Sequence, residues 1–506
     1  MRRVRASAAL LALGALALSA APAQAHVPSA AQCAASRAQR EVAPILALHH
    51  VKGAPRVFAM QFKQEVRNVV SYVSFRRKIE CLIRADVVPH LAHGVPNVVA
   101  FNEDIGLMAV GIGSRGRAAR ALLGDPAGDA HCSGQPSPCV AIDALSALNA
   151  AYAKPLARYR RRFGDLNPLS SAFVAGTDTL ARGFMQTFSD LARRYGIYIL
   201  GSSDQAPFAQ STKRADIAAF ADPDLPRPRS VFVATSARVY NQVFLWAPRN
   251  VRRGGPPMLR NVVATNRKVP LTPIEQAQGF TAGPSTGAAA RRNLAPYRLP
   301  GTKVRLGFAT SLPAFVYGAP PAGTDPCSDT AKYYMRCLDE LGASVVIQDE
   351  ANPGAWTGPD GDGIEQWQPL SWMSSTWRAV ADPSVRFLYN VTPMMVGNLG
   401  DLPFDGQSAI TQRGGAAGPG CHYIGNAAFV GGDDRPDLSE DAGAKPEFLA
   451  LAPWVTSDSS RAALRATGAQ LVPGSGAALE NDYVETALVA DLTVPVDRQR
   501  PGCAGG

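Results

Sequence analysis

Residues 191–202, LARRYGIYILGS, are the passage that decides the fold class, because they join a helical segment directly to a strand. Residues 179–195 carry apolar side chains at the spacing of a helix. Residues 196–201 form an apolar run of the length expected for a buried strand. The passage predicts a helix that packs on a sheet, and repetition of this unit is typical of an α/β protein.

The same alternation extends outward from this passage in both directions. Residues 56–62 form an apolar run bounded by Gly53 and Pro55, and a helix is expected over residues 71–91. Because no break in composition interrupts the pattern, we predict one α/β domain over residues 55–500, with a less regular insertion at about 109–178. Further strands are expected at 97–101, 230–235, 242–247, 304–310, 344–348 and 386–389, and further helices at 329–341 and 374–381.

The N-terminus has the form of a secretory signal. A basic start, MRRVR, precedes an apolar run over residues 8–21 and the small-x-small sequence Ala23-Gln24-Ala25. The apolar run is shorter than the ~20 residues that a membrane-spanning helix needs. We expect residues 1–25 to be a cleaved signal peptide and residues 26–54 a variable leader. The mature protein is expected to be secreted or held in the cell envelope, without stable membrane insertion.

The cysteines and the composition agree with an exported globular protein. All eight cysteines lie beyond residue 25, and an even number is typical of structural disulfides in such proteins. Cys132 and Cys139 flank a turn-rich loop and are the easiest pair to propose, while the remaining connectivity stays open. The wide spacings and the lack of a C-x-x-C motif argue against a metal site, so no metal or cofactor is predicted.

The formal net charge is +10, but the basic residues are spread along the chain rather than gathered in one tract. The densest cluster is RYRRR, residues 158–162, in the predicted insertion. A solvated helix face explains such a cluster more simply than a nucleic-acid site does. We therefore expect no nucleic-acid partner.

Several short motifs, taken in order, resemble the carbon-nitrogen hydrolase (nitrilase-like) superfamily. Each motif is weak alone, but unrelated α/β chains are not expected to reproduce the whole succession. The resemblance implies an α-β-β-α sandwich, a site of one Glu, one Lys and one Cys, a small-molecule substrate, and pairing into a homodimer. The motifs are FNE at 101–103, LARRYGIYILGS at 191–202, YN at 240–241, NRKVPL at 266–271, LGASVVI at 341–347, WRA at 377–379, YNV at 389–391 and FDGQSAI at 404–410.

Two charged residues match the family's catalytic positions. Glu103 ends the motif FNE, and the resemblance makes it the general base that takes the proton from the nucleophile. Lys268 stands in the motif NRKVPL, where its charge would stabilise the oxyanion of the tetrahedral intermediate. Without the family context, Glu103 is a solvated loop acid and Lys268 a surface lysine, and these alternatives stay open.

The nucleophile departs from the family pattern. Alignment of the strand at 304–310 on Gly307 puts Ser311 where the family keeps its cysteine, and a carboxylate base alone activates a hydroxyl poorly. Cys327 is the alternative nucleophile, because residues 327–329, CSD, have the family's C-x-D pattern. Against it, no strand leads into Cys327, and a disulfide, for instance with Cys337, is the plainer interpretation. A chain without a catalytic nucleophile is the third alternative.

The segment DEANPGAW, residues 349–356, follows the strand that lines the substrate pocket in the family. Glu350 and Trp356 are the candidates for substrate binding, with an acid pair that stabilises its own loop as the alternative. The sequence thus predicts a secreted hydrolase of non-peptide amide or nitrile-type carbon-nitrogen bonds. An inactive relative that binds a small amide-like ligand is the alternative function, and a disulfide-stabilised structural or interaction protein is the third.

Overall fold

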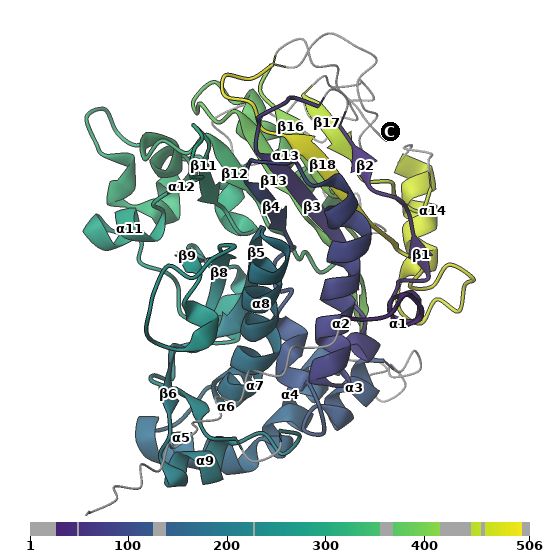
Figure 1. Ribbon diagram of the computed structural model, residues 1–506, viewed down its shortest axis with the longest axis vertical. Helices are drawn as coiled ribbons and strands as arrows, with labels where there is room; N and C mark the ends of the chain where they lie inside the picture. The colour runs from purple at the N-terminus through teal and green to yellow at the C-terminus, as the bar shows by residue number, and fades with distance from the viewer. Residues whose placement is uncertain are drawn as a thin grey trace, which may run out of the picture.

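The computed structural model describes residues 27–47, 50–124, 138–225, 228–354, 368–414, 447–456 and 461–497. The predicted signal peptide, Cys132 and Trp356 lie outside these ranges. In the described part of the chain, strands and helices alternate as the sequence predicts, and the strands form two large sheets that pack face to face (Figure 1).

The first sheet contains β3, Arg56–Lys63, the strand predicted at 56–62. Its side chains alternate between two buried faces: Val57 and Ala59 pack against the second sheet, and Phe58, Met60 and Phe62 pack against helices. The path through the sheet is β1-β18-β3-β4-β5-β8-β9, with β2 beside β18 and β14 beside the end of β3. The bounds are β1 Arg40–Glu41, β2 Ile45–Leu46, β4 Asn97–Ala100, β5 Tyr198–Gln205, β8 Tyr240–Trp246, β9 Val262–Arg267, β14 Met395–Leu399, β15 Leu402–Phe404 and β18 Val484–Asp491.

The second sheet has the strand order β10-β11-β12-β13-β16-β17, with β11, β12 and β13 parallel and the outer strands antiparallel. The prediction at 386–389 places β13 three residues too early, because β13 is Tyr389–Thr392. The strand predicted at 230–235 is β7, Val231–Ala234, which pairs with β6, Phe208–Ser211, in a separate two-stranded sheet. The remaining bounds are β10 Tyr297–Arg298, β11 Arg305–Phe308, β12 Val345–Ile347, β16 Ala409–Gln412 and β17 Phe448–Leu451.

Apolar side chains from both sheets fill the space between them, as when Leu200 and Leu245 of the first sheet share a buried cluster with Phe308 and Ile347 of the second. Helices cover the two outer faces. α2, Tyr72–Leu82, and α8, Gln186–Tyr195, pack on the first sheet. α12, Thr330–Glu340, and α13, Gln368–Ala381, pack on the second. The layers are helix, sheet, sheet and helix, so the predicted α-β-β-α sandwich is confirmed.

The stretch at 109–178, expected to be irregular, is largely helical in its described part. Its helices gather at the end of the molecule that Figure 1 shows at the bottom. The expectation of an irregular segment was wrong. The two longest helices here have 13 and 11 residues, and only the other three, of 7, 5 and 4 residues, are too short for a periodic pattern to emerge. The helices of this region are α3 Arg117–Leu123, α4 Cys139–Ala151, α5 Ala153–Phe163, α6 Ser171–Ala175, α7 Thr177–Leu180 and, further along the chain, α9 Arg214–Phe220.

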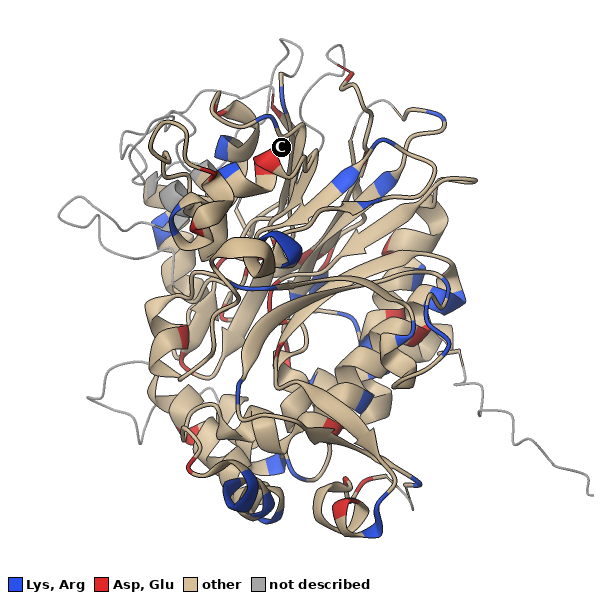
Figure 2. Ribbon diagram, turned by 90° about the vertical axis from the view of Figure 1, so that its left-hand side faces the viewer, with Lys and Arg blue, Asp and Glu red and all other residues tan. Residues whose placement is uncertain are grey.

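The arginine cluster at 158–162 lies on α5, a helix with blue turns at the bottom of Figure 2. All four of its arginines are exposed. Tyr159, between them, is buried against the neighbouring core. The cluster thus lies on an exposed helix face, and the expectation that it binds no nucleic acid stays a prediction.

Two disulfides have both cysteines among the described residues, with sequence separations of 48 and 10 residues. Cys33–Cys81 ties the leader helix α1, Ala30–Ala34, to α2, and Cys327–Cys337 ties a short 3-10 turn to α12. Cys139 is also disulfide-bonded, while Cys132, proposed as its partner, lies outside the described residues. The remaining helices are α10 Pro273–Ala277, α11 Gly287–Asn293 and α14 Arg461–Leu471, and no helix in the described ranges is long and apolar enough to cross a bilayer.

Candidate active site

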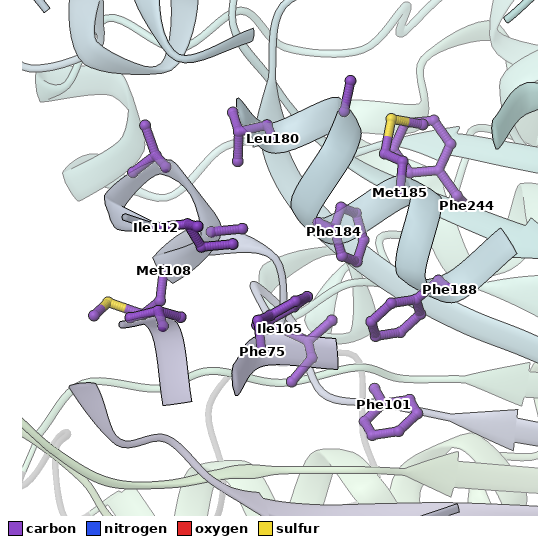
Figure 3. Packing of buried hydrophobic residues seen from close by; sticks show 14 of the residues in the cluster. Phe75, Phe101, Ile105, Met108, Ile112, Leu180, Phe184, Met185, Phe188 and Phe244 are labelled. Carbon is purple, nitrogen blue, oxygen red and sulfur yellow. The ribbon is translucent and has the colours of Figure 1, made fainter. Parts of the chain in front are cut away.

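Glu103 lies just beyond the end of β4, in a turn held by apolar side chains. Phe101 and Ile105 flank it in the chain, are fully buried, and pack beside Phe184 and Phe188 (Figure 3). The rings of Phe101 and Phe188 meet at a centroid distance of 5.2 Å. Because Glu103 itself is only 3% exposed, the alternative of a solvated loop acid is wrong.

Lys268 follows β9 and meets Glu103 inside the protein. Its Nζ donates a hydrogen bond of 2.8 Å to Glu103 Oε1 and lies 3.0 Å from Glu275 Oε2. Asn241 Nδ2 donates to the same two acids, at 2.7 Å to Glu103 and 2.9 Å to Glu275. Lys268 is 3% exposed, so it is a buried cation shared by two carboxylates rather than a surface lysine.

Glu275 was missed by the sequence analysis. It is the third residue of α10, where Thr272 and Glu275 form a capping box and the Glu275 carboxylate accepts the Thr272 N–H at 2.8 Å. The same carboxylate faces Lys268, so the helix start also positions an acid in the site. The sequence Thr-Pro-x-Glu at 272–275 is a recognisable helix start and was the available signal.

Ser311 stands at a sharp turn after β11. Its backbone has φ 56° and ψ −120°, a combination that residues with a Cβ rarely adopt. It is strained and persists only where the surroundings enforce it. Ser311 is 2% exposed, its N–H donates to the Asp349 carbonyl at 3.1 Å, and a 3-10 turn, Leu312–Phe315, begins directly after it. Gly307 precedes it in β11, where a Cβ would lie only 2.8 Å from the Leu338 side chain of α12. The turn is thus tightly fixed.

One segment links Ser311 to Glu103. Asp349 accepts the Ser311 N–H, and two residues further along, the Ala351 N–H donates to Glu103 Oε2 at 3.1 Å. The structure therefore brings Glu103, Lys268 and Ser311 to the same end of the sandwich, at the ends of β4, β9 and β11. Their catalytic roles stay predictions.

Cys327 does not offer a nucleophile. Its sulfur is bonded to that of Cys337, and both residues are buried beside α12. A disulfide sulfur carries no thiolate, the form of cysteine that attacks an acyl carbon. The alternative assignment of the nucleophile to Cys327 is therefore corrected, and the disulfide interpretation is confirmed.

Glu350 is fully buried at the edge of the site. Its Oε1 accepts a hydrogen bond of 2.7 Å from Gln348 Nε2, and burial, followed by the charge of Glu103, raises its pKa well above the ordinary value. The neighbouring Asp349 carboxylate accepts from Thr310 and Ser202. Glu350 thus binds a group of its own segment, as the loop-stabilising alternative expects, while the Asp349 carboxylate binds residues of two other segments. The substrate-binding role of Glu350 stays a prediction, and Trp356, named with it, lies outside the described residues.

The electrostatics suit a base beside a fixed cation. Burial raises the pKa of Glu103 above its ordinary value, although the charge of Lys268 works against the rise. Burial by itself would lower the pKa of Lys268, but Glu103 and Glu275 outweigh it and raise that pKa. Burial raises the pKa of Asp349 to about 7, with the Glu103 charge as the second cause. The lysine therefore stays charged, while Glu103 holds a proton more readily than a free acid does, as a general base near neutral pH requires.

Two more acids surround this group and were also missed. Burial raises the pKa of Asp104 and of Asp204 well above the ordinary value, and the charges of Glu103 and Glu275 add to the rise at both. The acids come from the ends of several strands, and only the sheet order brings them together. Within the described ranges, no group of three or more His, Cys, Asp or Glu side chains is arranged to hold a metal ion.

Two surface hollows lie away from the candidate residues. One, of about 600 Å³, is lined by residues that include Lys52, Arg298 and Leu492. The other, of about 440 Å³, is lined by residues that include Glu65, Asn398 and Glu480. Neither hollow is lined by Glu103, Lys268 or Ser311.

No protein-family model and no curated protein matches the chain. Among solved structures, the chain is similar to an amidase of the nitrilase superfamily from Nesterenkonia sp. AN1. The structure of its cysteine-to-serine mutant is 13% identical to this chain, with a TM-score of 0.32. The match covers 71% of this chain and 84% of the amidase. The chain is also similar to a carbon-nitrogen hydrolase from Helicobacter pylori G27, at 11% identity and a TM-score of 0.36, over 71% of this chain and 81% of that one. Both likenesses are distant.

Proposed function

We propose that the chain hydrolyses carbon-nitrogen bonds other than peptide bonds, in a small amide or nitrile-type compound, through Glu103, Lys268 and Ser311. The observation that carries the proposal is the buried contact of 2.8 Å between Glu103 Oε1 and Lys268 Nζ, made at the end of the sandwich where the Ser311 turn also lies. A base and a permanent cation beside a strained nucleophile turn are the groups that acyl transfer needs.

For an amide, the reaction has two halves. Glu103 takes the proton of the Ser311 hydroxyl as Oγ bonds to the carbonyl carbon, and the Lys268 charge stabilises the oxyanion. The C–N bond then breaks, the nitrogen leaves with the proton from Glu103, and the acyl group stays on Ser311 as an ester. In the second half, Glu103 takes a proton from water as the water oxygen attacks the ester. The ester bond breaks, and Ser311 recovers its proton.

The compartment and the assembly are part of the same proposal. The disulfides Cys33–Cys81 and Cys327–Cys337 support an oxidising, extracytoplasmic location. A small molecule as the partner, and pairing into a homodimer, follow from the family resemblance.

The test is turnover combined with intact-mass spectrometry. The protein would be incubated with a panel of carboxamides and nitriles, with ammonia release and any covalent adduct measured together. We expect turnover that falls by at least about 1000-fold in Ser311→Ala and in Glu103→Gln, because residues that act as a unit each remove most of the rate. An adduct on the wild type should be absent in Ser311→Ala.

A control variant separates chemistry from folding. Asp222→Asn changes a buried acid that accepts hydrogen bonds from Tyr72 and Thr179, outside the site, and should keep the turnover. If the wild type forms no adduct and releases no ammonia, but still binds an amide in calorimetry, the hydrolase proposal fails. The chain would then be the inactive ligand-binding relative, which the hydroxyl at the nucleophile position favours.

A further inference from the structure

The inner faces of the two sheets are apolar over most of their length and become polar at the end that holds the candidate site. Along β12 the residues of the inner face are Val345 and Ile347, and the next position in this alternation is Asp349. Asp349 has no exposed surface. A carboxylate in such a place is stable only if it receives hydrogen bonds.

The carboxylate receives one bond from each sheet. Thr310, the residue before Ser311 in the second sheet, donates its hydroxyl to Asp349 Oδ1 at 2.8 Å. Ser202 of β5, in the first sheet, donates its hydroxyl to Asp349 Oδ2 at 2.9 Å. The Ser202 hydroxyl in turn accepts the N–H of Asp104, the residue after Glu103, at 2.9 Å. The two hydrogen bonds to the Asp349 carboxylate are buried, and the one from Asp104 is partly buried.

We infer that Asp349 is a positioning residue, which locks the Ser311 turn of the second sheet to the Glu103 turn of the first through Thr310 and Ser202. This inference rests on the proposed function, in which Ser311 attacks and Glu103 takes its proton. Asp349 touches neither side chain and acts through the residues next to them.

The backbone of Ser311 explains why such a lock is needed. A positive φ persists only where neighbouring contacts prevent the turn from relaxing. Asp349 fixes the turn twice, because its carbonyl accepts the Ser311 N–H at 3.1 Å while its carboxylate holds Thr310. Release of Thr310 would let the Ser311 hydroxyl move relative to Glu103, and a shift near 1 Å can cost about 100-fold in rate.

The test compares four variants of the full chain, with the amide that the wild type turns over fastest. Asp349→Asn and Thr310→Val should each lower kcat by about 10- to 100-fold and change KM by less than about threefold, because positioning is lost while binding is not. Thr310→Ser keeps the hydroxyl and should restore kcat to within about threefold of the wild type. Asp222→Asn is the matched control, because Asp222 is also buried and accepts two hydroxyl hydrogen bonds of 2.8 Å.

The outcomes are distinct. If Asp349→Asn keeps kcat, or if Asp222→Asn loses as much, Asp349 has no positioning role and the inference is overturned while the proposed function stands. If Asp349→Asn does not fold, Thr310→Val and Thr310→Ser test the inference instead. An equal kcat in these two variants would overturn it, because only Thr310→Ser keeps the hydroxyl that binds Asp349. If the wild type turns over no amide or nitrile and forms no adduct on Ser311, the proposed function fails first and the inference falls with it.

Discussion

Ser311 stands at the position where the family that this chain resembles keeps a cysteine. A hydroxyl is a poor nucleophile beside a carboxylate base, because its pKa lies far above that of a thiol. The structure nevertheless gives Ser311 a rigid, strained turn at a strand end. Replacing the Ser311 hydroxyl oxygen by sulfur therefore tests the reactivity of the nucleophile while the geometry of the turn is kept.

Ser311→Cys should raise the rate of amide hydrolysis at least about tenfold over the wild type, because the turn is already shaped and a thiol yields its proton to Glu103 more readily. Ammonia release and the mass of the acyl-enzyme measure the effect, with Ser311→Ala as the inactive reference. If Ser311→Cys is as inactive as Ser311→Ala, the turn does not present its side chain to a substrate, and the assignment of the nucleophile is wrong.

Asp86 shows how a buried acid away from the site sets the pH dependence of stability. It lies in the π-helical turn after α2 and is 3% exposed. Burial raises its pKa to about 7; Glu41 and Glu485 add to the rise, while Arg37 and Lys78 oppose it. The folded-state pKa lies above the unfolded one, so this group favours folding at low pH and weakens folding as pH rises from about 4 to about 7.

Asp86→Asn should therefore raise the free energy of unfolding at about pH 8 by up to about 4 kcal/mol, and change it little at about pH 4. Urea unfolding at several pH values measures this difference. Asp165→Asn, at an exposed position, is the control and should change neither value. An equal stabilisation by Asp86→Asn at both pH values would contradict the explanation.

At the scale of elements, the loop after β11 is fixed to α12 by the disulfide Cys327–Cys337. One buried apolar cluster contains both of these cysteines, Ala309 and Ala314 on either side of the Ser311 turn, and Val269 next to Lys268. The disulfide thus supports two parts of the candidate site. Cys33–Cys81 ties the leader to α2 instead, on the opposite side of the first sheet from the second.

Removal of Cys327–Cys337 should mainly lower activity, whereas removal of Cys33–Cys81 should mainly lower stability. The pair Cys327→Ser and Cys337→Ser should lower kcat about tenfold, because the Ser311 turn loses support. The pair Cys33→Ser and Cys81→Ser should keep kcat but cost more stability. Cys33–Cys81 spans 48 residues and Cys327–Cys337 spans 10. By the entropy of the unfolded chain, the longer cross-link stabilises the fold by about 4 kcal/mol and the shorter one by about 3 kcal/mol. Steady-state kinetics and thermal unfolding measure both, and equal losses of kcat would contradict the special role of Cys327–Cys337.

At the scale of the whole molecule, the C-terminal strand β18 completes the first sheet beside β3, near the N-terminal end of the chain. The two strands pair antiparallel from Thr486 opposite Gln61 to Asp491 opposite Arg56. Beside them, Lys78 of α2 forms a buried ion pair of 2.5 Å with Glu485, and both side chains are 1% exposed. This pair joins segments 407 residues apart in sequence.

Lys78→Met should lower the free energy of unfolding by about 3 to 5 kcal/mol, because it leaves the buried Glu485 charge without its counter-ion. Adding Glu485→Gln should recover more than half of this loss, because glutamine is neutral and can still accept the Lys63 N–H, which donates to Glu485 at 3.0 Å. Urea unfolding of the single and double variants completes the cycle. Additive losses would mean that the ion pair does not link the ends of the fold.

The sequence by itself determined most of the strands and helices, and its resemblance to a known family singled out Glu103, Lys268 and Ser311, whose catalytic roles stay predictions. These follow from local patterns, because the alternation of a strand, the spacing of a helix and a short motif are all contained within a few residues. The short helices within 109–178 escaped detection for the same reason, since each holds too few turns to show a period.

Only the tertiary structure decided which of these residues meet. Lys268 and Glu103 are 165 residues apart, and their contact depends on the order of β4, β5, β8 and β9 in one sheet. The hydrogen bond from Ser202 to Asp349 depends further on how the two sheets face each other. The disulfide that leaves Cys327 without a free thiol depends on the path of the loop between β11 and α12. Such contacts have no local signature, because sheet order and packing are set by burial of the whole apolar surface at once.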